Sequence, residues 1–299
     1  MEAEKNRTEE FIARIKLNKQ VEAEMEHLRF GILESVHRRI EAKQSQVRRQ
    51  RTTWMAAASI ALLVGLSAGL MWLLQSGPAQ PRLVELTCPL GVKSTLTLPD
   101  GTSVLMNGGT RLSYQAEEFG EEERRVWIDG EAFFDVVRNE EAPFIVHGGS
   151  TQVRVLGTRF NVESYESDEC VKVTLESGRV SMTVDNVAGE CLLAPGQQAV
   201  YNKQAHKLQR HTADVSEALA WCNDKMVFTD TPLDEIARKL ERRFNIRIEI
   251  QTEALKQVRY NGAFTANDNW QRILSMLAMM DSRIEYQEPN DVIIIRQTD

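Results

Sequence analysis

The sequence predicts a multi-domain membrane protein with a helical cytoplasmic segment, one transmembrane helix, an all-β periplasmic domain and a small C-terminal α+β domain. Three observations lead to this fold class. An uncharged, mostly apolar run covers Trp54–Leu74. Apolar residues then recur with a period of two to about residue 210, and beyond residue 213 strands alternate with amphipathic helices. We place the domains at residues 1–51, 52–76, 77–212 and 213–299.

The N-terminal segment, residues 1–51, is expected to be helical because it contains no proline and only one glycine, Gly31. Apolar residues recur in it at steps of three and four, which places them on one face of a helix. A segment of about fifty residues buries too little surface to be stable alone, and we therefore expect its apolar stripe to pack against another surface. Self-packing, a coiled-coil dimer and a cytosolic protein partner all remain open. The stripe consists of Val21, Met25, Leu28, Ile32, Val36 and Ile40, and the first five are the expected partner-binding surface.

The apolar run has the length of a transmembrane helix, since 21 helical residues extend ~31 Å. Residues 37–51 hold six basic side chains and residues 75–89 only Arg82. Basic flanks stay in the cytoplasm, so we expect a single pass through the inner membrane with the N-terminus cytoplasmic and the C-terminus periplasmic. A cleaved signal peptide, with Gly77–Ala79 as its cleavage site, is disfavoured because about fifty residues precede the run.

Residues 83–210 read as an all-β domain of about ten or more short strands. Apolar and polar residues alternate in several segments, and turn sequences rich in Gly, Pro, Asn and Asp separate them. A roll, a sandwich and a β-helix fit this pattern equally well. The clearest segments are Val92–Leu98, Arg159–Val162, Val171–Leu175 and Val180–Val184.

The C-terminal domain is predicted to contain two βαβ units. In the first, Thr231 is the expected N-cap, with Pro232 at the first helical position. Val292–Arg296 reads as a buried final strand; its Val292–Ile295 portion could instead be an edge for strand addition, which we favour less. The other predicted strands are Lys225–Phe228, Ile246–Ile250, Val258–Phe264 and Arg283–Tyr286, and the helices are Pro232–Arg243 and Asp268–Met280.

Charge separates the two ends of the chain. Residues 1–51 contain 12 Lys and Arg against nine Asp and Glu, whereas residues 82–299 contain 24 against 34. The acidic exported part argues against direct nucleic-acid binding there, and the basic residues beside the apolar run are better explained as a topology signal. The four cysteines, Cys88, Cys170, Cys191 and Cys222, form no CxxC pair. A Cys170–Cys191 disulfide and free buried thiols are equally compatible with the sequence.

The sequence offers no convincing catalytic or metal site. It contains no nucleophile elbow, zinc-protease motif or phosphate-binding glycine loop. Asp100 and Asp129 precede glycines in tight turns, where Asp serves backbone geometry, so a hydrolytic carboxylate pair formed by these residues with Glu131 is disfavoured. The acidic run at residues 117–123 and the scattered histidines read as solvated. We therefore predict no enzyme, no metal and no cofactor.

Ordered sequence blocks in the exported part carry a family resemblance. Each block is a turn followed by a strand, and a further set continues into the C-terminal domain. The first set comprises Leu98–Thr102, Leu105 with Asn107, Asp129–Val136, Pro143–Val146, Leu156–Val162 and Pro195–Ala199. The second comprises Trp221, Val227–Leu233, Asn261–Phe264 and Val292–Ile295. Together they resemble FecR-type transmembrane sensors, which are anti-sigma factors of iron and glycan uptake systems, over about residues 72–299.

The resemblance implies partners on both sides of a membrane. The C-terminal part resembles that of FecR-like proteins from Bacteroidetes and is similar to the short N-terminal signalling domain of secretins and TonB-dependent receptors. It therefore implies contact with the signalling domain of a TonB-dependent outer-membrane receptor. It also implies release or activation of an extracytoplasmic-function sigma factor in the cytoplasm, through regulated proteolysis. The alternative is a membrane-anchored carbohydrate- or envelope-binding module without a regulatory role.

Overall fold

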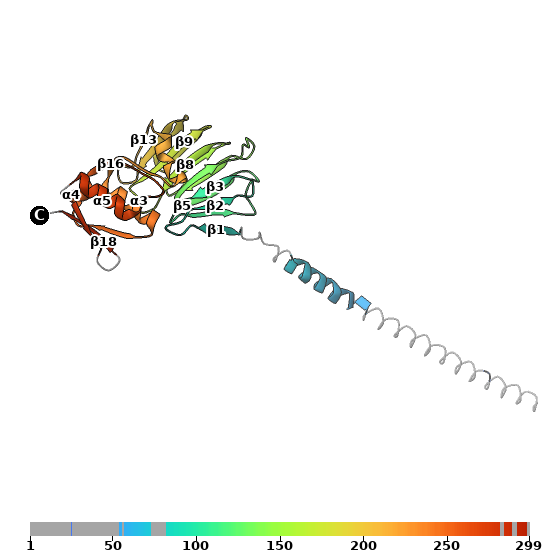
Figure 1. The fold of residues 1–299 in the computed structure, drawn as a ribbon. Coiled ribbons are helices and arrows are strands. Elements are labelled where there is room, and N and C mark those ends of the chain that lie inside the picture. The colour runs from blue at the N-terminus through green and yellow to red at the C-terminus, as the bar shows by residue number, and fades with distance from the viewer. Residues whose placement is uncertain are drawn as a thin grey trace, which may run out of the picture. The chain divides into compact units, whose positions relative to one another are not determined.

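The computed structural model describes residues 25, 54–55, 57–72, 82–281, 284–288 and 292–297. The chain divides into two compact units, Met1–Ala79 and Gln80–Asp299 (Figure 1). The described residues of the first unit are helical and exposed. Residues 56, 73 and 74 of the predicted apolar run are not among them. Within the described part of the chain, no helix combines the length and the hydrophobicity needed to cross a membrane.

The second unit begins with thirteen strands that form one continuous hydrogen-bonded network. This confirms the large, mostly β domain. Predicted and observed strands agree closely, and β10 has the predicted bounds. The strands are β1 Leu83–Thr87, β2 Ser94–Thr97, β3 Ser103–Met106, β4 Arg111–Gln115, β5 Arg124–Asp135, β6 Phe144–Gly148, β7 Thr151–Val155, β8 Arg159–Ser164, β9 Cys170–Ser177, β10 Val180–Val184, β11 Val187–Leu193, β12 Gln197–Asn202 and β13 Lys207–Thr212.

Strand β5 joins two layers of this domain. Its first half pairs with β4 and β6, and its second half pairs with β3 and β8. The change occurs at Gly130, which has φ +138° and where a Cβ would lie 2.6 Å from the backbone of Thr110. One layer continues through β7, β10 and β11, and the other through β9, β12 and β13. At the far end Arg210 of β13 donates to the Leu192 carbonyl at 2.7 Å.

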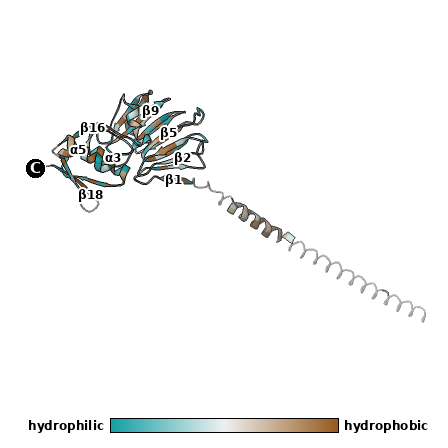
Figure 2. Ribbon diagram, viewed as in Figure 1, coloured by the Kyte–Doolittle hydropathy of each residue, from teal (hydrophilic) through white to brown (hydrophobic). Residues whose placement is uncertain are grey.

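A single apolar core fills the space between the layers. Along the strands, hydrophobic and hydrophilic residues alternate, so one face of each strand points to this core (Figure 2). The architecture is a roll close to a barrel. The β-helix alternative is wrong because neighbouring strands of the domain pair antiparallel, with β5 and β6 as the parallel exception among the described strands.

A small α+β domain with its own apolar core follows, as predicted. Its helices α3 and α5 bury their apolar stripes against two small sheets. The elements are α2 Val215–Ala218, the 3₁₀ turn η1 Ala220–Asn223, β14 Met226–Pro232, α3 Leu233–Phe244, β15 Arg247–Ile250, α4 Glu253–Lys256, β16 Arg259–Phe264, α5 Trp270–Met280, β17 Ile284–Gln287 and β18 Val292–Gln297.

Two predictions for this domain need correction, and a third choice between alternatives is decided. The order of strands and helices is right, but the two βαβ units are not paired as units, because β14 pairs with β16 and β15 pairs with β18. Alternation in a strand specifies its buried face and leaves its hydrogen-bond partner open. Strand β18 lies between β15 and β17, which confirms the favoured buried strand at Val292–Ile295 and excludes the edge alternative. The N-cap of α3 is Pro232, while the Thr231 hydroxyl donates to the Thr229 carbonyl.

All four cysteines are free thiols. The Cys170–Cys191 disulfide is therefore wrong, because β9 and β11 belong to different layers of the roll. Cys88 is fully buried, and its thiol contacts the Val92 carbonyl at 3.3 Å. Burial raises the pKa of the Cys222 thiol to about 12, which leaves it protonated and poorly nucleophilic at neutral pH.

Candidate functional site

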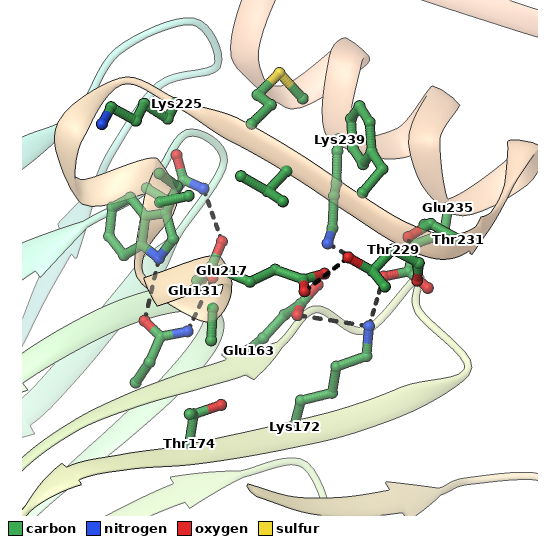
Figure 3. Close-up of a pocket in the computed structure, with 18 of the residues that line it drawn as sticks. Glu131, Glu163, Lys172, Thr174, Glu217, Lys225, Thr229, Thr231, Glu235 and Lys239 are labelled. Atoms are coloured by element: carbon green, nitrogen blue, oxygen red, sulfur yellow. Dashed lines mark hydrogen bonds and ion pairs between the residues drawn. The ribbon is translucent and has the colours of Figure 1, made fainter. Parts of the chain in front are cut away.

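A cleft of about 940 Å³ lies between the roll and the α+β domain of the second unit (Figure 3). One wall is the outer face of β5, β8, β9 and β12, and the other is formed by α2, η1, β14 and α3. Charged and hydroxyl-bearing side chains point into it from both walls. A cleft of this size at a domain boundary is a common location for ligand sites.

Three charged residues form a row across the floor of the cleft. Glu131 on β5 is paired with Glu163 on β8, which is paired in turn with Lys172 on β9. The two glutamates are only 9% and 8% exposed. Like charges directly opposite each other on antiparallel strands destabilise a sheet, so this row costs folding free energy.

Glu131 is held by two side-chain amides. Asn107 and Asn161 donate to its two carboxylate oxygens at 2.8 and 2.9 Å. Burial, followed by the charge of Glu163, raises the pKa of Glu131 to about 7. Because both of its oxygens already accept hydrogen bonds from the protein, Glu131 supports the site and is poorly placed to protonate a substrate.

The upper wall supplies one more carboxylate and a second ammonium group. Glu235 of α3 contacts Lys172 at 2.5 Å and Lys239 at 3.2 Å. Burial opposes ionisation of Glu235, yet the two lysines outweigh it and lower its pKa to about 2. Glu163 is further from its partner, at 3.8 Å from the Lys172 ammonium group. Glu163 therefore has the greater unused capacity to accept hydrogen bonds.

Polar contacts to η1 join the two domains at one end of the cleft. The Trp221 indole nitrogen donates to the Asn161 amide oxygen at 3.2 Å, and Asn161 in turn holds Glu131. Lys93 donates to the carbonyls of Trp221 and Cys222, both at 3.1 Å, and pairs with Asp224 at 2.8 Å. The tryptophan thus connects the α+β domain to the buried glutamate.

Arg242 of α3 fastens the other end. Its guanidinium carbon lies 3.6 Å from the centre of the Tyr165 ring, and one of its nitrogens donates to Asp168 at 2.9 Å. A second nitrogen also contacts Asp168, which makes the pair bidentate. The Arg242 carbonyl accepts from the Gly91 amide at 2.8 Å, and a Cβ on Gly108 would lie 2.6 Å from that carbonyl oxygen. The backbone of the roll at Gly91 and Gly108 therefore lies close to α3.

The structure places the predicted site residues in different parts of the chain. Of the apolar stripe, Met25 is helical and 61% exposed, whereas Val21, Leu28, Ile32 and Val36 lie outside the described residues. Asp100 is paired with Arg124 and Asp129 with Arg111. No cluster of His, Cys, Asp and Glu in the described part of the chain could hold a metal ion.

Sequence reasoning missed Glu163, Lys172, Glu235 and Lys239. On β8 and β9 the charged residues occupy the polar positions of an alternating pattern, which normally face water. No local signal shows that a second domain covers that face. Glu163 and Glu131 lie 32 residues apart and meet only through strand pairing.

Comparison with known proteins gives matches to family models and to solved structures. A family model described as "FecR protein" matches residues 85–181, and one described as "FecR, C-terminal" matches residues 225–295. Two crystal structures, at 2.50 and 1.65 Å resolution, are of a "putative anti-sigma factor from Parabacteroides distasonis ATCC 8503". Each has a TM-score of 0.68 and 29% identity and is covered completely, over 73% and 72% of this chain. No curated protein matches the chain.

Proposed function

Because the chain is a FecR family protein that carries the FecR C-terminal domain, we propose that it is a single-pass inner-membrane anti-sigma factor. In this proposal the N-terminal stripe binds an extracytoplasmic-function sigma factor. The exported unit receives a signal from the signalling domain of a TonB-dependent outer-membrane receptor. The observation that carries the proposal is the order of the two family matches along one chain, together with the match to the crystallised Parabacteroides chain, which is covered completely.

The apolar run and its charged flanks support the membrane part of the proposal. Residues 57–72 are helical and carry exposed apolar side chains. A signal must bias two distinguishable states to pass through one helix. Regulated proteolysis near the membrane meets this requirement, since a cut chain and an intact chain are distinct. The roll and the α+β domain are then the receiving surface, and residues 1–51 are the output.

Co-purification tests the sigma-factor partner. We expect the full-length chain to capture a sigma factor from its own cells. Leu28→Asp should abolish the capture, because a charge in the centre of the stripe must be desolvated at the interface. His27→Asp is the matched control, since it adds the same charge on the opposite face of the predicted helix and should leave capture unchanged.

Two results would contradict the proposal. Capture that survives Leu28→Asp would remove the stripe from the interface. The absence of any sigma factor, together with retention of the chain on envelope polysaccharide, would favour the alternative of an anchored binding module. Mass spectrometry of the proteins captured by wild-type and variant chains gives the first result, and a retention assay on envelope polysaccharide completes the second.

A further inference from the structure

The cleft between the roll and the α+β domain has features that sigma-factor regulation does not require. A helix that packs on a sheet normally buries apolar residues, and α3 does so on its other face through Leu233, Ile236 and Leu240. Toward the roll, α3 presents Glu235 and Lys239 to a hollow, charged space (Figure 3). The space is large enough for a ligand of two or three rings.

The buried carboxylates are the strongest indication of a site. Glu131 and Glu163 face each other on adjacent strands and are both more than nine-tenths buried. Glu163 points into the cleft, and its contact with Lys172 is a 3.8 Å ion pair, longer than a hydrogen bond. Its carboxylate oxygens therefore face the cleft with capacity to accept hydrogen bonds from a bound group.

The surrounding groups restrict the chemical class of ligand. An anion would face Glu131 and Glu163, whereas a cation would face Lys172 and Lys239. Hydroxyl groups both donate and accept, so a polyol can bond to a carboxylate and an ammonium group through neighbouring oxygens. Threonine hydroxyls also line the cleft, and Trp221 and Phe228 supply apolar surface to it. The threonines are Thr174, Thr229 and Thr231.

We propose that this cleft binds a neutral polyhydroxylated ligand, a mono- or oligosaccharide, whose hydroxyl groups donate to Glu163 and accept from Lys239. The ring carbons pack against Trp221. The ligand contacts both domains, so its binding favours the docked arrangement of roll and α+β domain. The proposal is independent of sigma-factor capture, and either can fail without the other.

Titration calorimetry on the full-length chain in detergent tests the proposal. The probes are a panel of neutral pentoses, hexoses and their disaccharides, with a dipeptide and inorganic phosphate for comparison. We expect at least one saccharide to bind with a dissociation constant of about 1 mM or tighter. Glu163→Gln should weaken that binding at least tenfold, and Lys239→Gln should do so independently. Glu123→Gln, on a carboxylate that pairs with Arg125 and Arg154 away from the cleft, is the matched control.

Several results would overturn the proposal. One is the absence of saccharide binding at about 10 mM while the chain remains folded. Binding of the dipeptide or phosphate alone would assign the cleft to a charged ligand instead. Equal saccharide affinity in wild type, Glu163→Gln and Lys239→Gln would place the sugar elsewhere on the chain. The Lys239→Gln arm keeps the test informative if Glu163→Gln fails to fold.

Discussion

Arg124 shows how one buried charge organises the roll. Its side chain is 1% exposed, and it donates to the Asp100 carboxylate at 2.8 Å and to the carbonyls of Ala142 and Val137 at 2.7 Å. These bonds hold the loops around residues 100 and 137–142 against the start of β5. The turn role predicted for Asp100 is present as well, since its carboxylate accepts from the Thr102 amide at 2.9 Å.

We predict that Arg124→Ala lowers the free energy of unfolding by about 3–5 kcal/mol, because it removes the charge partner of the Asp100 carboxylate and the donor to two carbonyls. The neighbouring Arg125→Ala is the control. Arg125 is 49% exposed and pairs with Glu123, so its loss should cost less than about 1 kcal/mol. Chemical denaturation of both variants checks this. Equal losses would show that Arg124 is not a buried organising charge.

Glu131 makes stability depend on pH. Its pKa of about 7 in the folded chain lies above the ordinary value of 4.5, so the folded state binds the proton more tightly. Stability should therefore fall as pH rises from about 5 to 7 and level off above that, by at most roughly 3 kcal/mol for this group. Glu235 acts in the opposite sense and at lower pH, because its lowered pKa removes stability only below about 4.5.

We predict that Glu131→Gln removes most of the stability change between pH 5 and pH 8. Glutamine keeps the shape of the side chain and carries no titratable proton. Denaturation curves of wild type and variant at the two pH values are the measurement. If the free energy of unfolding of Glu131→Gln still changed with pH as it does in the wild type, another group would control stability in this pH range.

At the scale of elements, helix α3 makes contacts through two different faces. Leu233, Ile236 and Leu240 enter the core of the α+β domain, as their spacing predicts. Glu235, Lys239 and Arg242 lie at steps of four and three on another face, which meets the roll. A charged stripe on a helix usually faces solvent, and here the roll covers it. The same stripe therefore positions one wall of the cleft and fastens the domain.

We predict that Arg242→Lys loosens docking of α3, because lysine has neither the flat guanidinium that stacks on Tyr165 nor the paired donors for Asp168. Faster hydrogen exchange at the Gly91 amide, which donates to the Arg242 carbonyl, reports the loosening. A tenfold increase is expected. Arg272→Lys, which replaces a 68% exposed residue of α5, is the control. Equal exchange in both variants would contradict the role of Arg242.

The elements that could be predicted from sequence are those set by local pattern. The alternation in Val180–Val184 and the apolar spacing of α3 specify a strand and a helix without knowledge of the rest of the chain. The FecR resemblance could be recognised because its sequence blocks are local as well, and the two family matches confirm it. Strand partners and the cleft depend on contacts between residues that are far apart in the sequence, and local pattern contains no information about such contacts. Lys172 and Glu235, which meet in the cleft, are 63 residues apart.

At the scale of the whole molecule, the account requires one chain with its ends in two compartments. The asymmetry of basic residues around the apolar run predicts the orientation, and the sigma-binding stripe and the exported unit have a common function only if that orientation holds. If both ends shared one compartment, no signal would need to cross a membrane.

Reporter fusions at the two ends test this requirement most directly. Green fluorescent protein placed ahead of residue 1 should fluoresce, because it folds in the cytoplasm, and alkaline phosphatase placed after residue 299 should be active, because it needs the oxidising periplasm. Inactive phosphatase at the C-terminus, or active phosphatase placed ahead of Arg51, would contradict the account.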